Sequence, residues 1–539
     1  MLRNARLYAH TLPHLTCWQM AGRIVARVRA MAGLVRLPVP PESFRARSRP
    51  HVPFPEHEPW NRREDILQGR FCFLNQAADL GRPVDWRAQS MPLLWRFNLH
   101  YFHYLHLLAR NEQEGLCRSW VHANPPGTAV SWHAYPTSLR IVNWCRANLQ
   151  ADDLQESLYL QAAHLYRNLE TYVYGNHLLE NARALVYAGV FFGDTGEAPR
   201  WLERGLQLYR KETPIQVLSD GGHYERSPMY HALMLEGYLD VLNLLPDGHP
   251  DRPWLEETVQ RMVGALVSMT HPDGNLALLN DATQEIALAP DDLLDYVHRL
   301  TGYRARKRSI LPETGYFIHE HDDLYLIIDG GPAGPDHLLA HAHADVFSYE
   351  LSLGGLPFVV DSGVYEYQAG PMRQYVRGTG AHNTVCVDGV DQIECWGSFR
   401  VARRSAPHDV SFSIEEGRSR FEGTYSGYAR LVGDGITHRR RIDVDERQRE
   451  IIVTDQVTGA GRHRVESRIH FHPEVSIEEG EHIVIRRESV SCQLHIDSGT
   501  LRWEDGWYCP RFGVRHRNRV AVIESNGKLP KRLAYRFHY

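Results

Sequence analysis

Apolar residues change their spacing once along the chain, near residue 310. Before that point they recur every three or four residues, as in LLWRFNLHYFHYLHLLAR (residues 93–110) and LENARALVYAGVFF (residues 179–192), a spacing typical of amphipathic helices. After it, short segments such as GYFIHEHDDLYLIIDGG (residues 315–331) alternate or carry β-branched clusters between turns, which predicts strands. The pattern therefore divides the chain into a helical part and a β part.

Three regions follow from this pattern. Residues 1–75 hold a helical segment and a Pro-rich connector (residues 37–60), residues 76–305 form a helical domain, and residues 306–539 form a β domain. Many short strands without intervening helices predict an antiparallel β-sandwich, so the fold class is an α+β multidomain protein. No βαβ alternation and no glycine-rich phosphate loop occurs, which argues against nucleotide-binding folds.

Composition excludes several other classes of protein. The 539 residues are 43% hydrophobic and carry a net charge of -5, which argues against disorder and against a nucleic-acid partner. No apolar run of 18 or more residues occurs, so no membrane span is expected. Eight cysteines without CxxC pairs and the lack of a signal-peptide pattern predict reduced thiols and a cytoplasmic location, with a periplasmic or secreted location as the alternative.

The first motif that carries chemistry is YGNHLLENARAL (residues 174–185). On a helix, Asn176 lies four residues before Glu180 and His177 lies three before it, so the polar side chains form one patch. Taken alone, this motif is better explained by side chains that cap or bridge neighbouring helices.

The second motif is HYERSPMYH, residues 223–231. Ser227 followed by Pro228 predicts a helix N-cap with proline at the first helical position, which puts Tyr230 in the first turn. The positive end of the helix dipole, together with the nearby Arg226, predicts a lowered pKa for this tyrosine. A tyrosine of that kind acts as a base and then as an acid, whereas a tyrosine that only packs in the core is an equally good explanation.

The third motif combines HAHAD with two later residues. A predicted strand puts His341, His343 and Asp345 on one face, Asp361 ends an apolar strand, and His382 follows a glycine-rich turn. Two histidines and a carboxylate suit zinc, while histidines that only donate or accept hydrogen bonds remain the alternative. No GxSxG motif or recognisable cysteine nucleophile supports a catalytic triad.

Together the three segments, in this order, resemble the heparinase II/III-like polysaccharide lyases, and the N-terminal LYAHTL and GRIVARV segments also look like those of this family. The resemblance covers most of the chain. It implies an incomplete (α/α) toroid joined to an antiparallel β-sandwich, with the active-site cleft between them. It also implies β-elimination at a 4-linked uronic acid, which leaves an unsaturated sugar at the new end.

The resemblance also implies a role for each motif residue. Asn176 matches the asparagine that neutralises the substrate carboxylate in one branch, and His177 with Glu180 matches the pair of the heparinase II branch. Because both patterns are present, the dominant neutralising residue is left open. Tyr230 matches the general acid and base, and His341 matches the histidine that binds the carboxylate or removes the proton.

His343, Asp361 and His382 match a metal site of some members of the family. The predicted cofactor is one divalent metal ion, zinc in first place and manganese in second, and no organic cofactor is expected. The resemblance favours a structural role for this ion over a Lewis-acid role, because the substrate carboxylate already has other candidate partners.

Further residues are predicted to line the cleft and to bind an anionic sugar through aromatic and cationic groups. Ordinary surface positions explain any one of them equally well. Besides Glu180, these residues are Trp132, His133, Tyr135, Arg140, Arg226 and Arg377.

The function predicted first is a polysaccharide lyase for an anionic uronic-acid polysaccharide or oligosaccharide, with the glycosaminoglycans hyaluronan, chondroitin and heparan sulfate as substrates. A lyase for alginate or a bacterial exopolysaccharide is the alternative, followed by a glycoside hydrolase and a non-catalytic carbohydrate-binding protein. A hydrolase needs two carboxylates around the scissile bond, whereas the motif positions hold Asn, His and Tyr with the single Glu180.

Overall fold

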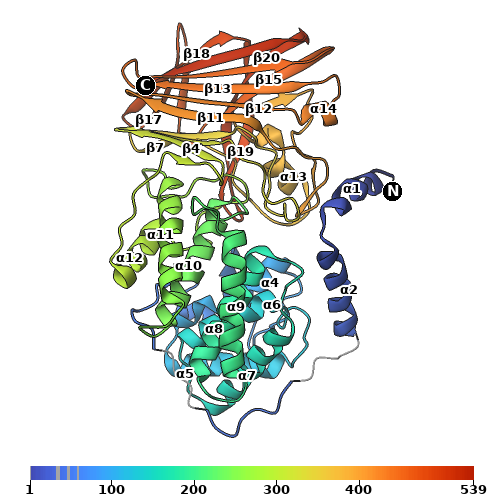
Figure 1. The fold of residues 1–539 in the computed structure, drawn as a ribbon, viewed down its shortest axis with the longest axis vertical. Helices are drawn as coiled ribbons and strands as arrows, with labels where there is room; N and C mark the ends of the chain where they lie inside the picture. The colour runs from blue at the N-terminus through green and yellow to red at the C-terminus, as the bar shows by residue number, and fades with distance from the viewer. Residues whose placement is uncertain (1, 32–36, 45–48, 58–59) are drawn as a thin grey trace.

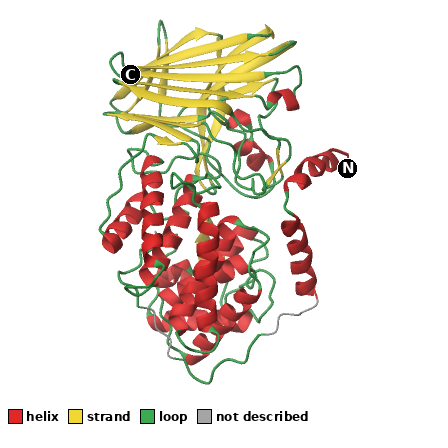
Figure 2. Cartoon of the chain, in the orientation of Figure 1, coloured by secondary structure: helices red, strands yellow, loops and turns green. Residues whose placement is uncertain are grey.

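The computed structural model describes residues 2–31, 37–44, 49–57 and 60–539 (Figure 1). A helical domain and a β domain lie end to end along the long axis, and two N-terminal helices lie beside both (Figure 2). The α-helices are α1 Leu2–Thr11, α2 Cys17–Met31, α3 Arg63–Leu67, α4 Leu93–Tyr101, α5 Arg110–Ala123, α6 Ala134–Arg146, α7 Asp152–Arg167, α8 Gly175–Phe192, α9 Ala198–Gln216, α10 Pro228–Leu244, α11 Arg252–Ser268, α12 Pro290–Thr301, α13 Pro371–Arg377 and α14 Tyr428–Leu431. Within the described ranges, no helix is both long enough and apolar enough to cross a membrane.

The strands form antiparallel ladders throughout. Their bounds are β1 Arg70–Phe73, β2 Gln76–Asp79, β3 Ile310–Leu311, β4 Tyr316–His321, β5 Leu324–Asp329, β6 Tyr349–Leu353, β7 Leu356–Val359, β8 Val385–Val387, β9 Cys395–Trp396, β10 Arg400–Val401, β11 His408–Glu415, β12 Arg418–Tyr425, β13 Thr437–Asp445, β14 Glu450–Thr458, β15 Arg462–His470, β16 Ser476–Glu479, β17 Ile483–Arg487, β18 Val490–Ser498, β19 Thr500–Arg511, β20 Val514–Lys528 and β21 Lys531–His538.

The helical domain is built around α8, which packs against α6, α9 and α10. Nearly all of its residues are buried, including several polar ones, as expected of a helix inside a domain. Its one arginine, Arg183, is buried and forms ion pairs with Glu236 and Asp240 of α10. Arg146 of α6 binds the same two carboxylates, so one buried charge cluster ties three helices together.

The β domain contains three larger sheets with the strand orders β3-β4-β5-β6-β7, β19-β20-β15-β8 and β11-β12-β13-β14-β21-β18-β17-β16. Side chains from all three sheets, such as Ile328, Ile469 and Ile442, share one apolar core. The β-sandwich predicted from the short alternating segments is therefore present.

Two local predictions are wrong. The region predicted to be helical contains the hairpin β1–β2, whose turn residues Leu74 and Asn75 have φ of 55° and 57°, as a tight two-residue hairpin turn requires. The segment from His341 to Asp345 is a loop and not a strand, because its backbone bonds to side chains and to α13. Ala344 N–H, for example, donates to the carbonyl of Arg377 (3.0 Å).

The N-terminal arm, defined as residues 2–31, contacts both domains. The Tyr8 ring lies edge-on to Trp396 of the β domain with ring centroids 4.8 Å apart, and Thr11 Oγ1 donates to the Val401 carbonyl (3.1 Å). On the other side, Trp18 Nε1 donates to the carbonyl of Thr171 in the helical domain (3.1 Å). The arm thus bridges the two domains at one side of the molecule (Figure 1).

Candidate active site

A cavity of about 1020 Å³ lies between the helical domain and the β domain. Segments from both domains and from the N-terminal arm line it. Four residues predicted to be catalytic are among the lining residues: Asn176, His177, Tyr230 and His341. The structure therefore brings these four together from α8, α10 and the loop before β6.

Asn176 is held at the start of α8 by a buried carboxylate. Its backbone N–H and its Nδ2 donate to the two oxygens of Glu225, each at 2.9 Å. This approach requires glycine at position 175, where φ is +61° and a Cβ would lie 2.0 Å from Glu225 Oε1. Asn176 Oδ1 is buried without a hydrogen-bond partner, so an acceptor is left beside the cavity.

His177 lies next to Asn176 and is about one-third exposed. Its Nδ1 lies 3.0 Å from Glu170 Oε1, and its ring lies against Tyr135 with centroids 4.3 Å apart. Burial lowers the pKa of His177, but the charges of Glu170, Glu225 and other carboxylates outweigh burial and raise this pKa above its ordinary value. A cationic side chain is thus favoured at the cavity.

Tyr230 lies in the first turn of α10, as the sequence predicts. Ser227 Oγ accepts from the Tyr230 N–H (3.4 Å) and donates to the Asp281 carbonyl (2.7 Å). The phenol oxygen lies 3.2 Å from that of Tyr367, and the ring lies 3.9 Å from the ring of His341, measured between centroids.

The predicted lowering of the Tyr230 pKa is wrong. Burial, with additional contributions from Tyr367 and Asp281, raises the pKa of Tyr230 well above its ordinary value. Arg226 does not counter this effect, because its guanidinium donates to the backbone carbonyls of Thr314 and Glu313. The hydroxyl is therefore protonated at neutral pH.

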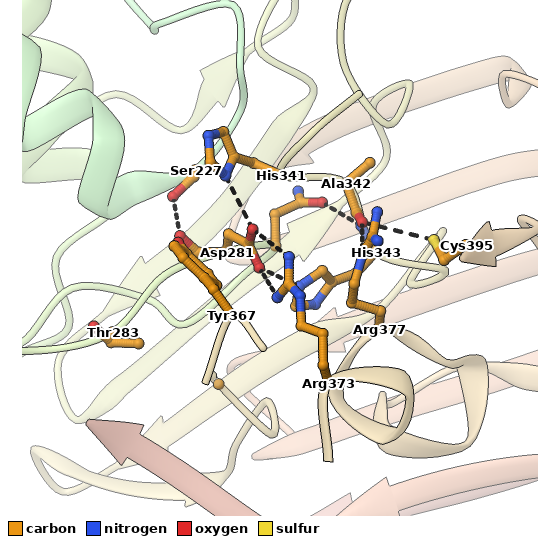
Figure 3. A network of polar contacts seen from close by, with 12 residues as sticks. Ser227, Asp281, Thr283, His341, Ala342, His343, Tyr367, Arg373, Arg377 and Cys395 are labelled. Carbon is orange, nitrogen blue, oxygen red and sulfur yellow. Dashed lines mark hydrogen bonds and ion pairs between the residues drawn. The ribbon is translucent and has the colours of Figure 1, made fainter. Parts of the chain in front are cut away.

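Asp281, a buried carboxylate, binds two histidines of the β domain, His341 and His343 (Figure 3). His341 Nδ1 lies 2.9 Å from Oδ2, and His343 Nε2 lies 2.8 Å from Oδ1. Arg373 binds both oxygens, and despite the opposing effect of burial these contacts hold the pKa of Asp281 well below its ordinary value. His341 Nε2 also lies 3.4 Å from Glu225 Oε2, so this imidazole lies between two carboxylates.

The three residues predicted to bind a metal form one buried cluster. Ligand atoms of His343, Asp361 and His382 lie within 4.8 Å of one another. His382 Nδ1 bonds Asp361 Oδ2 at 2.7 Å, whereas His343 Nδ1 and His382 Nε2 are buried without partners. Unpartnered imidazole nitrogens beside a carboxylate fit the ligand set of a divalent transition metal.

Of the residues predicted to bind substrate, Tyr135 alone lines the cavity, and His133 is an exposed N-cap of α6. Arg140 is fully buried and donates to Gln161 (2.7 Å). Arg377 is buried and donates to the Ala342 carbonyl (3.1 Å), while Glu180 pairs with a neighbouring arginine of α8. Contrary to the prediction, the following side chains do not line the cavity: Trp132, Arg140, Glu180, Arg226 and Arg377.

Several residues of the site were not predicted. Glu225 lies inside the second motif and Tyr367 lies between Asp361 and His382 of the third, so their positions beside motif residues were the available signal. Asp281, Arg373 and Glu170 lie outside every motif. Their roles depend on contacts with residues far away in the sequence, which spacing does not reveal.

Comparison with protein families gives two matches. A family model described as "Heparinase II/III N-terminus" matches residues 117–298, and one described as "Heparinase II/III-like, C-terminal" matches residues 304–535. Together they span the helical domain and the β domain.

Curated relatives and a solved structure agree with these matches. The chain is 26% identical over 257 residues to a heparin-sulfate lyase of Bacteroides stercoris and 24% identical over 247 residues to one of Pedobacter heparinus. Each alignment covers 41% of this chain and 37% of the relative, so the chain matches little more than a third of these relatives' length. A solved heparinase III structure superposes with a TM-score of 0.66 at 18% identity, covering 88% of this chain and 82% of that one. The predicted fold, an incomplete (α/α) toroid followed by a β-sandwich, is confirmed.

We expect Glu170→Gln to lower the pKa of His177. The negative charge of Glu170 favours the protonated imidazole, so removing this charge lowers the pKa of His177. The variant therefore loses the proton of His177 at a lower pH than the wild type does. NMR titration of isotope-labelled histidine measures this shift, with the exposed Glu203→Gln as the control. A His177 titration unchanged by Glu170→Gln contradicts the assignment.

Proposed function

Because the chain belongs to the heparinase II/III-like family, we propose that it is a polysaccharide lyase that cleaves a uronic-acid polymer by β-elimination. The observation that supports this proposal is the arrangement of the cavity. A cation-favouring histidine with an unpartnered amide oxygen lies on α8, and a tyrosine in contact with a histidine lies close by.

The first task of such a site is to make the C5 proton of the uronic acid removable. This proton is weakly acidic, because a neighbouring carboxylate anion cannot accept the negative charge that develops. Protonated His177 neutralises the substrate carboxylate. If this carboxyl group takes up a proton, Asn176 Oδ1 is available to accept a hydrogen bond from it. Both groups are fixed by buried carboxylates, so little reorganisation accompanies the reaction.

The second task is proton transfer. The C5–H bond breaks, its electron pair forms the C4=C5 double bond, and the C4–O4 bond breaks as O4 takes a proton. Tyr230 keeps its proton because of burial, so we assign it as the acid that protonates O4. His341 is then the base: Asp281 fixes its ring through Nδ1, and Nε2, which lies 3.4 Å from Glu225 Oε2, receives the proton, so that both carboxylates stabilise the imidazolium that forms.

A glycoside hydrolase is less consistent with the cavity. An inverting or retaining hydrolase needs one carboxylic acid that keeps its proton to protonate the leaving oxygen. Despite the opposing effect of burial, the contacts of Glu225 with His341, His223 and Asn176 lower its pKa, so this buried carboxylate of the cavity is ionised.

We place a glycosaminoglycan first among the substrates, because the two curated relatives are named heparin-sulfate lyases. Hyaluronan, chondroitin and heparan sulfate all contain a 4-linked uronic acid. Alginate and bacterial exopolysaccharides remain the alternatives. The substrate in each case is an anionic polysaccharide or an oligosaccharide derived from one.

The cluster of His343, Asp361 and His382 is proposed to hold one zinc ion, with manganese as the second candidate. When bound, the ion supplies two further bonds to buried imidazole nitrogens and fixes the loop that carries His341. We assign it a structural role, because His177 and Asn176 already serve the substrate carboxylate.

We expect Tyr230→Phe to reduce kcat by roughly 10²–10⁴-fold, since the hydroxyl carries a proton transfer and the ring only packs. Ultraviolet absorbance of the conjugated double bond, followed on a panel of uronic-acid polymers, measures turnover and tests the proposed function. Substrate affinity is expected to change little.

Two outcomes contradict these assignments. A wild-type protein that releases sugar fragments from a uronic-acid polymer without new ultraviolet absorbance is a hydrolase. A Phe variant that keeps more than about a tenth of wild-type kcat removes Tyr230 from proton transfer.

We expect His382→Ala to lose the metal and to lower the melting temperature, because metal binding is coupled to folding. Elemental analysis of protein purified without chelator measures the metal, and thermal unfolding measures the stability. The exposed His408→Ala serves as the control. The proposal is wrong if the wild type holds less than about a tenth of an equivalent of any transition metal and the variant has an unchanged melting temperature. The three residues then only hydrogen-bond to one another and to their neighbours.

A further inference from the structure

Strand β20 carries three arginines at alternate positions: Arg515, Arg517 and Arg519. Alternate residues of a strand share one face, and neighbours on that face lie roughly 6.6–6.8 Å apart along the strand. All three are exposed, and so is His516, whereas Asn518 and Val520 further along the strand are buried. This row of three, called the arginine ladder below, therefore lies on the solvent face of the sheet.

Aromatic rings of the neighbouring strand β19 hold the ladder in place. The guanidinium carbons of Arg515 and Arg517 lie 4.6 and 4.3 Å from the ring centroid of Trp507, which pairs directly with Arg517 in the sheet register. Arg519 lies 5.6 Å from the Trp503 ring. Such cation–π contacts restrict the guanidinium groups before any ligand binds.

The ladder carries free positive charge. Arg519 forms an ion pair with Asp505 (2.9 Å), but Arg515 and Arg517 have no carboxylate partner among the residues that the structure describes. Most neighbouring arginines differ, since Arg511 binds Glu285 and Arg502 binds three glutamates.

The ladder begins at the cavity. Arg515 also lies over the ring of Tyr365, 5.3 Å from its centroid, and Tyr365 lines the cavity. Phe512 and Gly513, in the turn between β19 and β20, line it as well. This turn is anchored to the helical part of the chain, because Asn75 Nδ2 donates to the Phe512 carbonyl (2.8 Å).

We propose that the arginine ladder is a second binding subsite, which holds the part of an anionic polysaccharide that extends out of the cavity. The contacts and exposure of the three arginines indicate a binding surface, and the identity of its ligand rests on the proposed function. Each free guanidinium offers a two-pronged set of donors that matches a carboxylate or a sulfate group. A polyanion that leaves the cavity past Tyr365 meets Arg515 first and Arg517 next.

The test compares Arg515→Gln/Arg517→Gln with the control Arg462→Gln/Arg532→Gln. The control removes two exposed strand arginines that also lack ion pairs among the described residues, and Arg462 pairs with the opposite end of β20. Both pairs are made in the Tyr230→Phe background, so that binding is measured without turnover. Heparan sulfate chains are the probe, titrated at several salt concentrations.

We expect the ladder variant to raise the Kd for the chains at least about threefold, within the range of roughly twofold to thirtyfold that the loss of two exposed charge contacts allows. Its Kd is also expected to depend less steeply on salt, because fewer cations meet the polymer. The control is expected to stay within about twofold of the parent, as distant surface charges contribute little. A tetrasaccharide of the same polymer, which fills the cavity first, is expected to lose less affinity than the chains.

Equal loss of affinity for chains and tetrasaccharide, or an unchanged Kd for the chains, overturns the ladder as a subsite. Thermal unfolding of the variants shows that they are folded. The result separates this proposal from the proposed function. If the protein binds the chains through the ladder but the wild type never produces the ultraviolet signal, the subsite stands and the lyase assignment fails. If the wild type cleaves them and Arg515→Gln/Arg517→Gln, made without the Tyr230 substitution, leaves KM unchanged, the reverse holds.

Discussion

The rest of the site depends on the ion pair between the buried carboxylate of Asp281 and Arg373. A buried charge is tolerated only when it is paired, and Arg373 supplies the pairing with both of its terminal nitrogens. The same two oxygens then bind His341 and His343, while the backbone carbonyl of this residue accepts from Ser227, the N-cap of α10. One aspartate therefore contacts the histidine beside Tyr230, the cluster of His343, Asp361 and His382, and the N-cap of the helix that carries Tyr230.

The candidate active site is assembled from both domains, and each domain contributes one histidine that lies beside buried carboxylates. The helical domain contributes His177, which is surrounded by carboxylates, and the β domain contributes His341, which lies between two of them. Each imidazole is thus held by anions that water cannot reach, in a low-dielectric region where such contacts are strong. Burial, together with Tyr367 and Asp281, raises the pKa of Tyr230 and keeps its proton in place.

Sequence predicted the local features of this site well and the long-range ones poorly. Helical periodicity predicted α8 and α10, and Ser227-Pro228 predicted where α10 begins. Both signals come from residues close together in the sequence. The contact between His341 and Asp281 joins residues 60 positions apart, and no spacing rule encodes it. Arg140 was predicted to line the cleft because a cationic group suits an anionic sugar, whereas it is buried and donates to Gln161 of a neighbouring helix, a contact that spacing does not encode.

The N-terminal arm makes the two domains mechanically dependent on each other. Residues 1–31 contain five arginines and no acidic residue, and the arm touches Trp396 on one domain and Thr171 on the other. A hinge motion that widens the cavity must break one of these anchors or unwind part of the arm. The arm therefore acts as a strap across the cavity: any change in the angle between the domains would strain the Tyr8–Trp396 contact or the Trp18–Thr171 hydrogen bond.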